Sequence, residues 1–240
     1  MNEFDNSYSQ QTQVSEGQVA AYLTRVMGWM ALGLLTTFTV ILLSLASRSF
    51  LAVLVSNPVI YYGVIILELV VVIAMNASAH KLSSTSATVM FLLYSALNGV
   101  TMTVFCLIFE TISIMTVFVL TAGIFLMLAV YGFVTKKDMT KMGTMAIFGL
   151  GGIILVSLVN IFLKNSVIDF IVCIVGVIIF IGLTVYDTQK IKNRYISAMA
   201  SGHTDESELV KKTAIFGALT LYLDFINLFI KLLRIFGKKR

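Results

Sequence analysis

Charged residues are scarce in this chain: Asp, Glu, Lys and Arg together make up 12% of its 240 residues. Soluble domains carry about 25% charged residues, whereas here 58% of the residues are hydrophobic and the mean hydropathy is +0.96. This balance excludes an ordinary soluble domain and predicts an integral membrane protein that is embedded in a lipid bilayer. The net charge of +5 does not indicate nucleic-acid binding, because most Lys and Arg residues lie between hydrophobic segments.

Cysteine and proline are nearly absent too. The two cysteines, Cys106 and Cys173, fall in separate hydrophobic tracts, which argues against a disulfide framework or a zinc site and is typical of packing residues. The only proline, Pro58, directly precedes the second hydrophobic tract, where the first turn of a helix tolerates it. Lys and Arg are absent from residues 1–24, so we expect an uncleaved membrane anchor rather than a signal peptide.

Seven hydrophobic tracts are long enough to cross a bilayer, because a hydrocarbon core of about 30 Å needs about 20 helical residues. They are residues 26–46, 59–79, 87–109, 112–134, 143–163, 167–187 and 214–234. We therefore predict an all-α protein with a polar cytosolic tail at 1–24, a seven-helix membrane domain at 25–237 and a basic tail at 238–240. The glycines of FGLGG at 148–152 follow no predicted strand, so they indicate close helix packing rather than a phosphate-binding loop, and we expect no cofactor.

Lys and Arg are divided unevenly between the two sides of the predicted helices. With a cytosolic N-terminus, the outer loops hold only Arg48 and Lys164. The cytosolic side then holds Arg25, Lys81, Lys136, Lys137, Lys141, Lys190, Lys192, Arg194, Lys211 and Lys212. The positive-inside rule thus predicts a cytosolic N-terminus and an external C-terminus, although the C-terminal tail is itself basic. The alternative is a last segment that dips into the membrane and returns, which would leave both ends cytosolic.

The last hydrophobic tract carries a row of polar and small residues. They are Thr213, Gly217, Thr220, Asp224, Asn227 and Lys231. Their spacing of three or four residues places them on one helix face, which predicts a helix in the bundle interior with this stripe facing a cavity or other polar groups. An ionised aspartate at the bilayer centre costs on the order of 2.5–3.5 kcal/mol. Asp224 therefore needs a cationic partner, a bound cation or a shared proton; alternatively, it bonds to a backbone or hydroxyl group and only fixes the helix register.

Other carboxylates lie within or beside the hydrophobic tracts. Asp187 ends the sixth tract, where it faces the negative end of the helix dipole and needs a partner, either Lys190 or a group across the bundle. Glu68, in the second tract, faces the same choice as the aspartate of the last helix. Asp169 at a helix start and Glu110 at a tract end are typical of structural or solvated residues.

Two segments carry a resemblance to a known family. VYDTQKIK at 185–192 and ALTLYLDFINLFIKLLRIFG at 218–237 resemble the Bax inhibitor-1 (TMBIM) family, in its bacterial YccA-like branch. TKKDMTKMG at 135–143 and LYSALNGVTMT at 93–103 fit the same family, and the likeness covers about residues 20–237. The resemblance implies a fold in which six helices surround a central seventh helix at the C-terminus.

The resemblance also implies a pH-sensitive calcium leak. Asp187 and Asp224 match the two acids of a diaspartyl proton sensor, and their oxygens would also suit Ca²⁺ as the transported ion. Two neighbouring carboxylates cannot both ionise cheaply, so we expect them to share a proton. On the predicted boundaries, however, Asp224 lies about 16 Å deeper than Asp187. The pair therefore requires that the sixth helix extend further inward or that an aqueous vestibule reach them.

Some residues that the family pattern calls for are less clearly matched. The basic latch of some members lies near the inner end of the second helix, but the stretch here is NASAHKLSS, without arginine. His80 and Lys81 are the candidates for that role. Glu68 resembles an acid in the same helix of some relatives, and it and Asn227 are candidate pore residues.

Other classes of protein match the sequence less well than a leak does. An intramembrane aspartyl protease would require glycines before its second aspartate and a proline motif, and both are missing. Without these protease motifs, we expect no enzyme. A retinal protein would require a lysine deep in the last helix, whereas Lys231 lies near its end. The main alternative is a non-conducting regulator or adaptor of the bacterial inner membrane that binds other membrane proteins, such as a quality-control protease, through residues 1–24.

Overall fold

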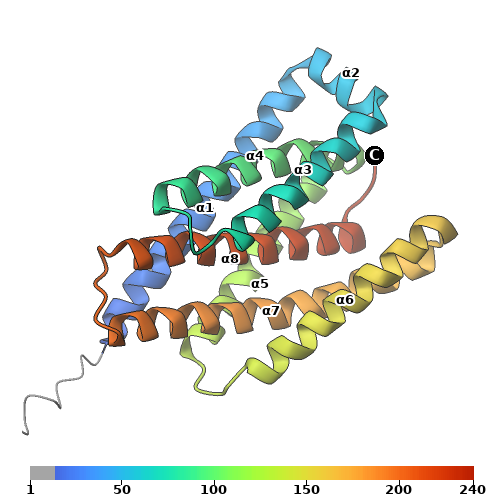
Figure 1. Ribbon diagram of the computed structural model, residues 1–240. Coiled ribbons are helices and arrows are strands. Elements are labelled where there is room, and N and C mark those ends of the chain that lie inside the picture. Colours follow the sequence, from blue (N-terminus) through green and yellow to red (C-terminus); the bar gives the residue numbers. More distant parts are fainter. Residues whose placement is uncertain (1–13) are drawn as a thin grey trace, which may run out of the picture.

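The computed structural model describes residues 14–240, and eight α-helices follow one another in this part of the chain (Figure 1). They are α1 (Glu16–Ala46), α2 (Arg48–Ser56), α3 (Pro58–Ala77), α4 (Ser84–Ile108), α5 (Thr111–Val134), α6 (Thr140–Leu163), α7 (Ser166–Ala200) and α8 (Glu208–Phe236). Seven are long and hydrophobic enough to cross a membrane, and α2 is a short helix between α1 and α3. The prediction of an all-α protein with seven membrane-spanning helices is confirmed.

Polar side chains fix where several helices begin. Ser15 Oγ accepts a hydrogen bond from Gln18 N, and Gln18 Oε1 accepts one from Ser15 N, so a capping box starts α1. Asn57 caps α3, with Pro58 in the first turn as its position in the sequence predicts. Asn165 Oδ1 accepts two backbone N–H bonds at the start of α7. These caps set the residue at which each hydrophobic helix face begins.

Several helices are longer than the hydrophobic tracts that predicted them. The first helix begins at Glu16, so residues 16–24 of the predicted tail lie in α1, residues 14 and 15 directly precede it, and the remainder lies outside the described residues. The helix of the sixth tract, α7, continues to Ala200, far past its predicted end. The predicted connection at 188–213 is therefore mostly helical, and only residues 201–207 separate α7 from α8. Polar helical turns extend these helices, and hydropathy alone does not detect them.

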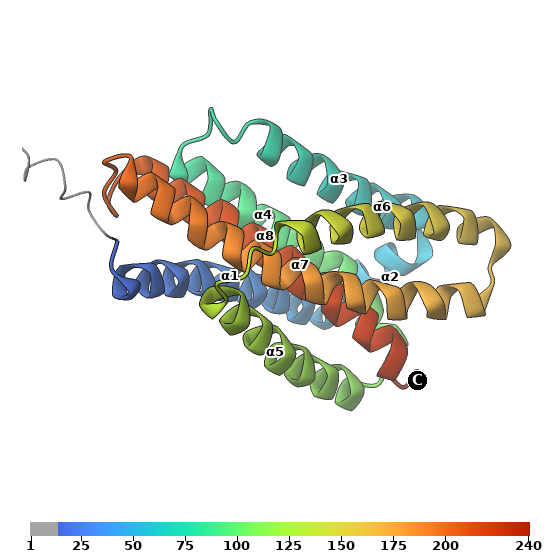
Figure 2. The same cartoon turned by 90° about the horizontal axis from the view of Figure 1, so that it is seen from below.

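Most of α8 is buried, and α7, α1, α5 and α4 pack against it (Figure 2). Helix α3 packs on α4 and helix α6 packs on α7, so α3 and α6 lie on the outside of the bundle. The expectation that six helices surround a central seventh is therefore not confirmed: four helices form the main contacts of α8.

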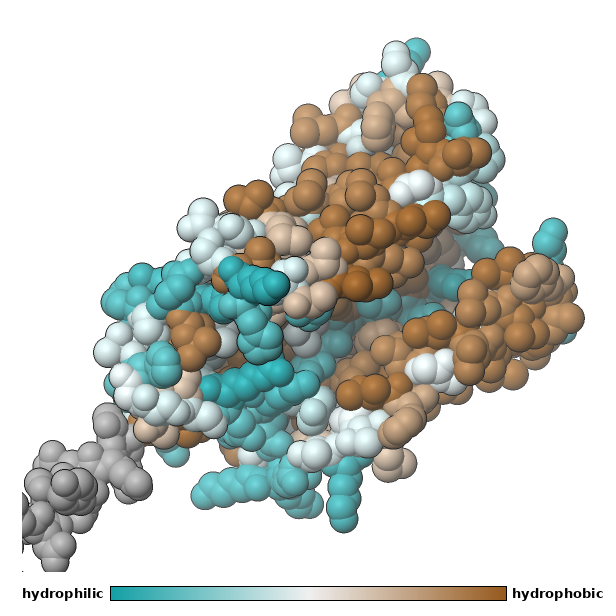
Figure 3. All heavy atoms as spheres, viewed as in Figure 1, coloured by the Kyte–Doolittle hydropathy of each residue, from teal (hydrophilic) through white to brown (hydrophobic). Residues whose placement is uncertain are grey.

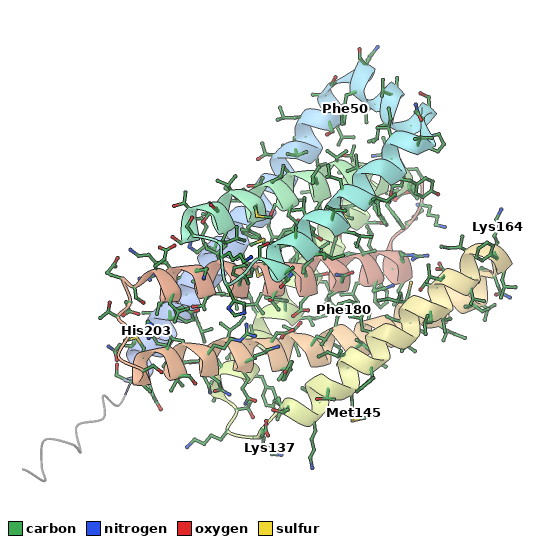
Figure 4. All side chains as sticks on the ribbon, in the orientation of Figure 1. Phe50, Lys137, Met145, Lys164, Phe180 and His203 are labelled. Carbon is green, nitrogen blue, oxygen red and sulfur yellow. The ribbon has the colours of Figure 1, made fainter. Side chains whose placement is uncertain are left out.

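The outward faces of the bundle are hydrophobic (Figure 3). On α6, Phe148 is 77% exposed and Phe162 is 86% exposed. Such exposure is unfavourable in water, whereas it is favourable where the side chains contact lipid. Charged residues lie at the helix ends instead, as Figure 4 shows for Lys137 and Lys164 at opposite ends of α6. The structure is that of an integral membrane protein.

The start of α1 and the end of α8 lie on opposite sides of the bundle. Near the start of α1, Tyr22 Oη donates to Thr213 Oγ1 near the start of α8 at 3.3 Å. At the other end, the backbone of the C-terminal tail joins the α4–α5 connection, where Arg240 N donates to Ile108 O at 2.9 Å. Helix α8 is thus continuous and crosses the bundle once, unlike the alternative in which this segment dips in and returns.

Candidate functional site

The polar stripe of α8 faces α7 rather than lipid. At Gly217, an added Cβ would lie 3.3 Å from the side chain of Ile191 on α7. Further along α8, the aliphatic part of Lys231 packs against Gly176, where an added Cβ would lie 3.0 Å from Lys231 Cε. The two contacts show that α7 and α8 run antiparallel. Gly217 and Asp224 of the stripe are buried, whereas its other four residues are half-buried.

Asp224 is the most deeply buried carboxylate among the described residues. Its side chain is on the face of α8 that meets α7, and the residue is only 4% exposed. Its Oδ2 atom is buried and has no hydrogen-bond partner among the described residues. The alternative interpretation, in which Asp224 bonds to a backbone or hydroxyl group, therefore has no support at this oxygen. An unpartnered buried polar atom costs about 1–3 kcal/mol, which calls for a compensating role.

Asp187 is half-buried on α7 and lies within electrostatic reach of Asp224. The register set by the glycine contacts places Asp224 level with Thr184 of α7, about one helical turn from Asp187. The predicted difference in depth of about 16 Å between the two aspartates thus falls to about one helical turn, because α7 extends well past Asp187 and brings it into the bundle. The cations that act on Asp187 are Lys190 and Arg194 of the same helix.

Close helix contacts hold this part of α7 in place. At Gly132 of α5, an added Cβ would lie 2.6 Å from Val185 O and 3.0 Å from Thr188 Cβ. Gly143 of α6 lies directly against the ring of Tyr186. Two helices that approach α7 at glycines therefore hold it beside Asp187, α5 against the backbone and α6 against the Tyr186 ring.

Glu68 belongs to a different polar cluster. Its Oε1 accepts a hydrogen bond from Thr101 Oγ1 at 2.8 Å, and its Oε2 accepts one from Asn98 Nδ2 at 3.5 Å. Tyr222 Oη of α8 donates to Asn98 Oδ1 at 3.1 Å and lies 2.7 Å from Thr37 Oγ1. The sequence analysis singled out Glu68 but missed its partners, because tyrosine and threonine are common in membrane helices. Asn98, in the hydrophobic tract of α4, was the other available signal.

The candidate latch residues and Asn227 do not contact the aspartate pair. Asn227 Nδ2 donates to Leu223 O of its own helix at 2.8 Å. Lys81 is exposed in the α3–α4 connection, and His80 lines a cavity of about 730 Å³ between the ends of α3 and α6. This cavity, the α3–α6 cavity, also borders the stripe residues Thr213 and Thr220. It provides a polar approach to the stripe from the end of the bundle at which α8 begins.

Metal ligands are few around the pair. Within residues 14–240, no group of three or more His, Cys, Asp or Glu side chains gathers as a metal site. A Ca²⁺ ion held by Asp187 and Asp224 would take its remaining oxygens from hydroxyl groups, carbonyl groups or water.

The fold and the site define a seven-helix integral membrane protein that buries an aspartate of its last helix against an aspartate-bearing neighbour. The chain belongs to the Bax inhibitor-1 family: the family model described as inhibitor of apoptosis-promoting Bax1 matches residues 19–240. Inner membrane protein YbhL of Escherichia coli (strain K12) is 44% identical over 219 residues, 91% of this chain and 92% of that protein.

Other bacteria also have relatives of similar extent. A protein of Borreliella burgdorferi is 42% identical over 219 residues, covering 91% of this chain and 92% of its own length. A membrane protein of Streptococcus pyogenes serotype M1 is 33% identical over 228 residues, covering 95% of this chain and 96% of its own. These matches confirm the family that the sequence motifs predicted.

Proposed function

We propose that this chain is a pH-sensitive calcium leak of the bacterial inner membrane, in which Asp187 and Asp224 share a proton that controls the passage of Ca²⁺. Its family and the name of the Escherichia coli relative support the location. The distribution of Lys and Arg supports a cytosolic N-terminus and an external C-terminus. In this orientation the α3–α6 cavity opens toward the cytosol.

The observation that carries the proposal is the buried, unpartnered Oδ2 atom of Asp224 at the interface with α7. Burial disfavours a charged carboxylate, and a second carboxylate nearby disfavours it further, so a proton shared by the pair lowers the cost. When that proton leaves, Lys190 and Arg194 offset the charge of Asp187. The charge of Asp224 remains uncompensated, which favours a different packing of α7 and α8 or the entry of a cation.

Competition between protons and Ca²⁺ follows from the same oxygens. Ca²⁺ takes about six to eight oxygen ligands, which carboxylates, carbonyl groups and water supply. Two carboxylates with water would bind the ion weakly enough to release it, as passage through a leak requires. Protonation removes the charge that attracts the ion, so proton binding and Ca²⁺ binding oppose each other.

The test is Ca²⁺ flux into liposomes that contain the purified full-length chain and a Ca²⁺-sensitive dye. We expect the flux of the parent chain to vary with pH, and Asp187→Asn and Asp224→Asn each to abolish that variation. Asp138→Asn is the matched control, because it removes an exposed carboxylate from the α5–α6 connection and should leave the pH profile unchanged.

A parent chain without pH-dependent flux, and unaffected by Asp224→Asn, would contradict the leak. The adaptor function would then account for the chain. In that case, removing residues 1–20 should abolish its cellular role, because that segment was predicted to bind the partner.

A further inference from the structure

The α3–α6 cavity is unusually basic. Three cations line it: Lys190 and Arg194 from α7 and Lys212 from the first turns of α8. Two histidines, His80 and His203, and one tyrosine, Tyr186, also line its wall. Among the described residues, none of those that line it is an aspartate or a glutamate. Helix α7 and the first turns of α8 thus collect positive charge around one hollow.

These cations are not neutralised by ion pairs. The salt bridges between described residues are Lys211–Glu206, Arg234–Asp169 and Lys238–Glu110. Lys190 Nζ instead lies 5.2 Å from the centre of the Tyr186 ring, and Lys212 Nζ is 3.5 Å from His80 O. Asp187 lies within electrostatic reach of Lys190 and Arg194 but forms no ion pair with them. The cavity therefore keeps donors that an anion can bind.

The surroundings of the cavity are those of a lipid-facing groove. Figure 3 shows hydrophilic residues in a recess between the hydrophobic surfaces of α3 and α6. Hydrophobic side chains are exposed on both neighbouring helices: Ile73 of α3 is 65% exposed and Met145 of α6 is 75% exposed. An amphiphile could thus place its polar group in the cavity and its hydrocarbon chains along α3 and α6. A free phosphate ion would leave the hydrophobic faces of both helices uncovered.

We propose that the α3–α6 cavity binds the phosphate headgroup of an anionic phospholipid, with Lys190, Arg194 and Lys212 as its ligands. Basic hollows between transmembrane helices at the cytosolic face suit such headgroups, because phosphate oxygens accept charge-assisted hydrogen bonds from Lys and Arg. The acyl chains would lie against the exposed faces of α3 and α6. The site does not depend on whether the chain conducts Ca²⁺.

Native mass spectrometry of the full-length chain, titrated with phosphatidylglycerol and with phosphatidylcholine, tests the proposal. We expect phosphatidylglycerol to bind more tightly, and the combined substitutions Lys190→Gln, Arg194→Gln and Lys212→Gln to weaken it. Each cation near a membrane surface contributes about fivefold in affinity, so the triple variant should lose roughly a hundredfold. If that variant does not fold, Lys212→Gln alone should lose about fivefold.

The matched control removes three lysines from the same end of the bundle but outside the cavity, Lys136→Gln, Lys137→Gln and Lys141→Gln. It should bind phosphatidylglycerol as the parent chain does. Equal losses in the two triple variants would overturn the site, because only the net charge would then matter. A further arm adds inorganic phosphate: displacement of phosphatidylglycerol by an equal concentration of inorganic phosphate would overturn the assignment to lipid.

Discussion

Because α5 approaches α7 closely at Gly132, we predict that Gly132→Ala lowers the free energy of unfolding by an amount that the contact distances allow us to bound. A methyl group at this position would lie 2.6 Å from Val185 O and 3.0 Å from Thr188 Cβ. Carbon and oxygen atoms normally stay about 3.3 Å apart or more, and the oxygen belongs to the backbone, so no side-chain rotation relieves the clash. Helix α5 must move away from α7 beside Asp187.

The expected cost follows from two opposing terms. Overpacking by a methyl group costs about 1–3 kcal/mol, while replacing glycine by alanine in a helix contributes up to about 1 kcal/mol in the opposite direction. Gly123→Ala is the matched control, because it lies on the same helix and a Cβ there meets nothing within 4 Å. The helix term cancels between the variants, so Gly132→Ala should be the less stable of the two by about 1–3 kcal/mol.

The assay is the free energy of unfolding in mixed micelles, followed by circular dichroism as the denaturing detergent is raised. Both variants should keep the helical content of the parent chain, so that the comparison concerns packing alone. Equal stabilities of Gly132→Ala and Gly123→Ala would refute the close contact between α5 and α7. The inference that α5 holds α7 beside Asp187 would then have to be abandoned.

Two further predictions concern polar groups elsewhere in the chain. Tyr222→Phe removes the hydroxyl that donates to Asn98 and should lower the free energy of unfolding by about 1–3 kcal/mol. Tyr62→Phe, on an exposed tyrosine, should have no measurable effect in the same detergent titration. Hydrogen bonds from Thr140 hold the pKa of Asp138 below its ordinary value, so their stabilising effect is lost as the pH falls through that lowered pKa. Thr140→Val should raise the pKa of Asp138 in a carboxyl NMR titration, and an unchanged value would contradict the bond.

Hydrophobic length was enough to predict the seven spanning helices, but it did not predict where they end. Helix α7 continues to Ala200 through polar turns that include Lys190 and Arg194, and a hydropathy window stops before them. The arrangement of helices around α8 was also not predictable in detail. Every spanning helix is hydrophobic, so composition does not say that α3 and α6 lie outside while the other four contact α8.

Asp187 and Asp224 could be chosen as candidates because both stand out against their hydrophobic neighbours in the sequence. A row of residues every three or four positions predicted which face of α8 carries Asp224, and the structure places that face against α7. The contact between Tyr222 and Asn98 could not be predicted, because it joins residues from two helices whose relative positions depend on packing. The same holds for the α3–α6 cavity, which exists only once separate helix ends meet.

The most direct test of the proposed switch is infrared difference spectroscopy of the carboxyl groups in liposomes, recorded as the pH is lowered. If Asp187 and Asp224 share a proton, acidification should produce a protonated-carboxyl band that disappears in Asp224→Asn and shifts in Asp187→Asn. The account is contradicted if the band of Asp224 stays constant over the whole pH range, or if replacing Asp187 leaves it unchanged.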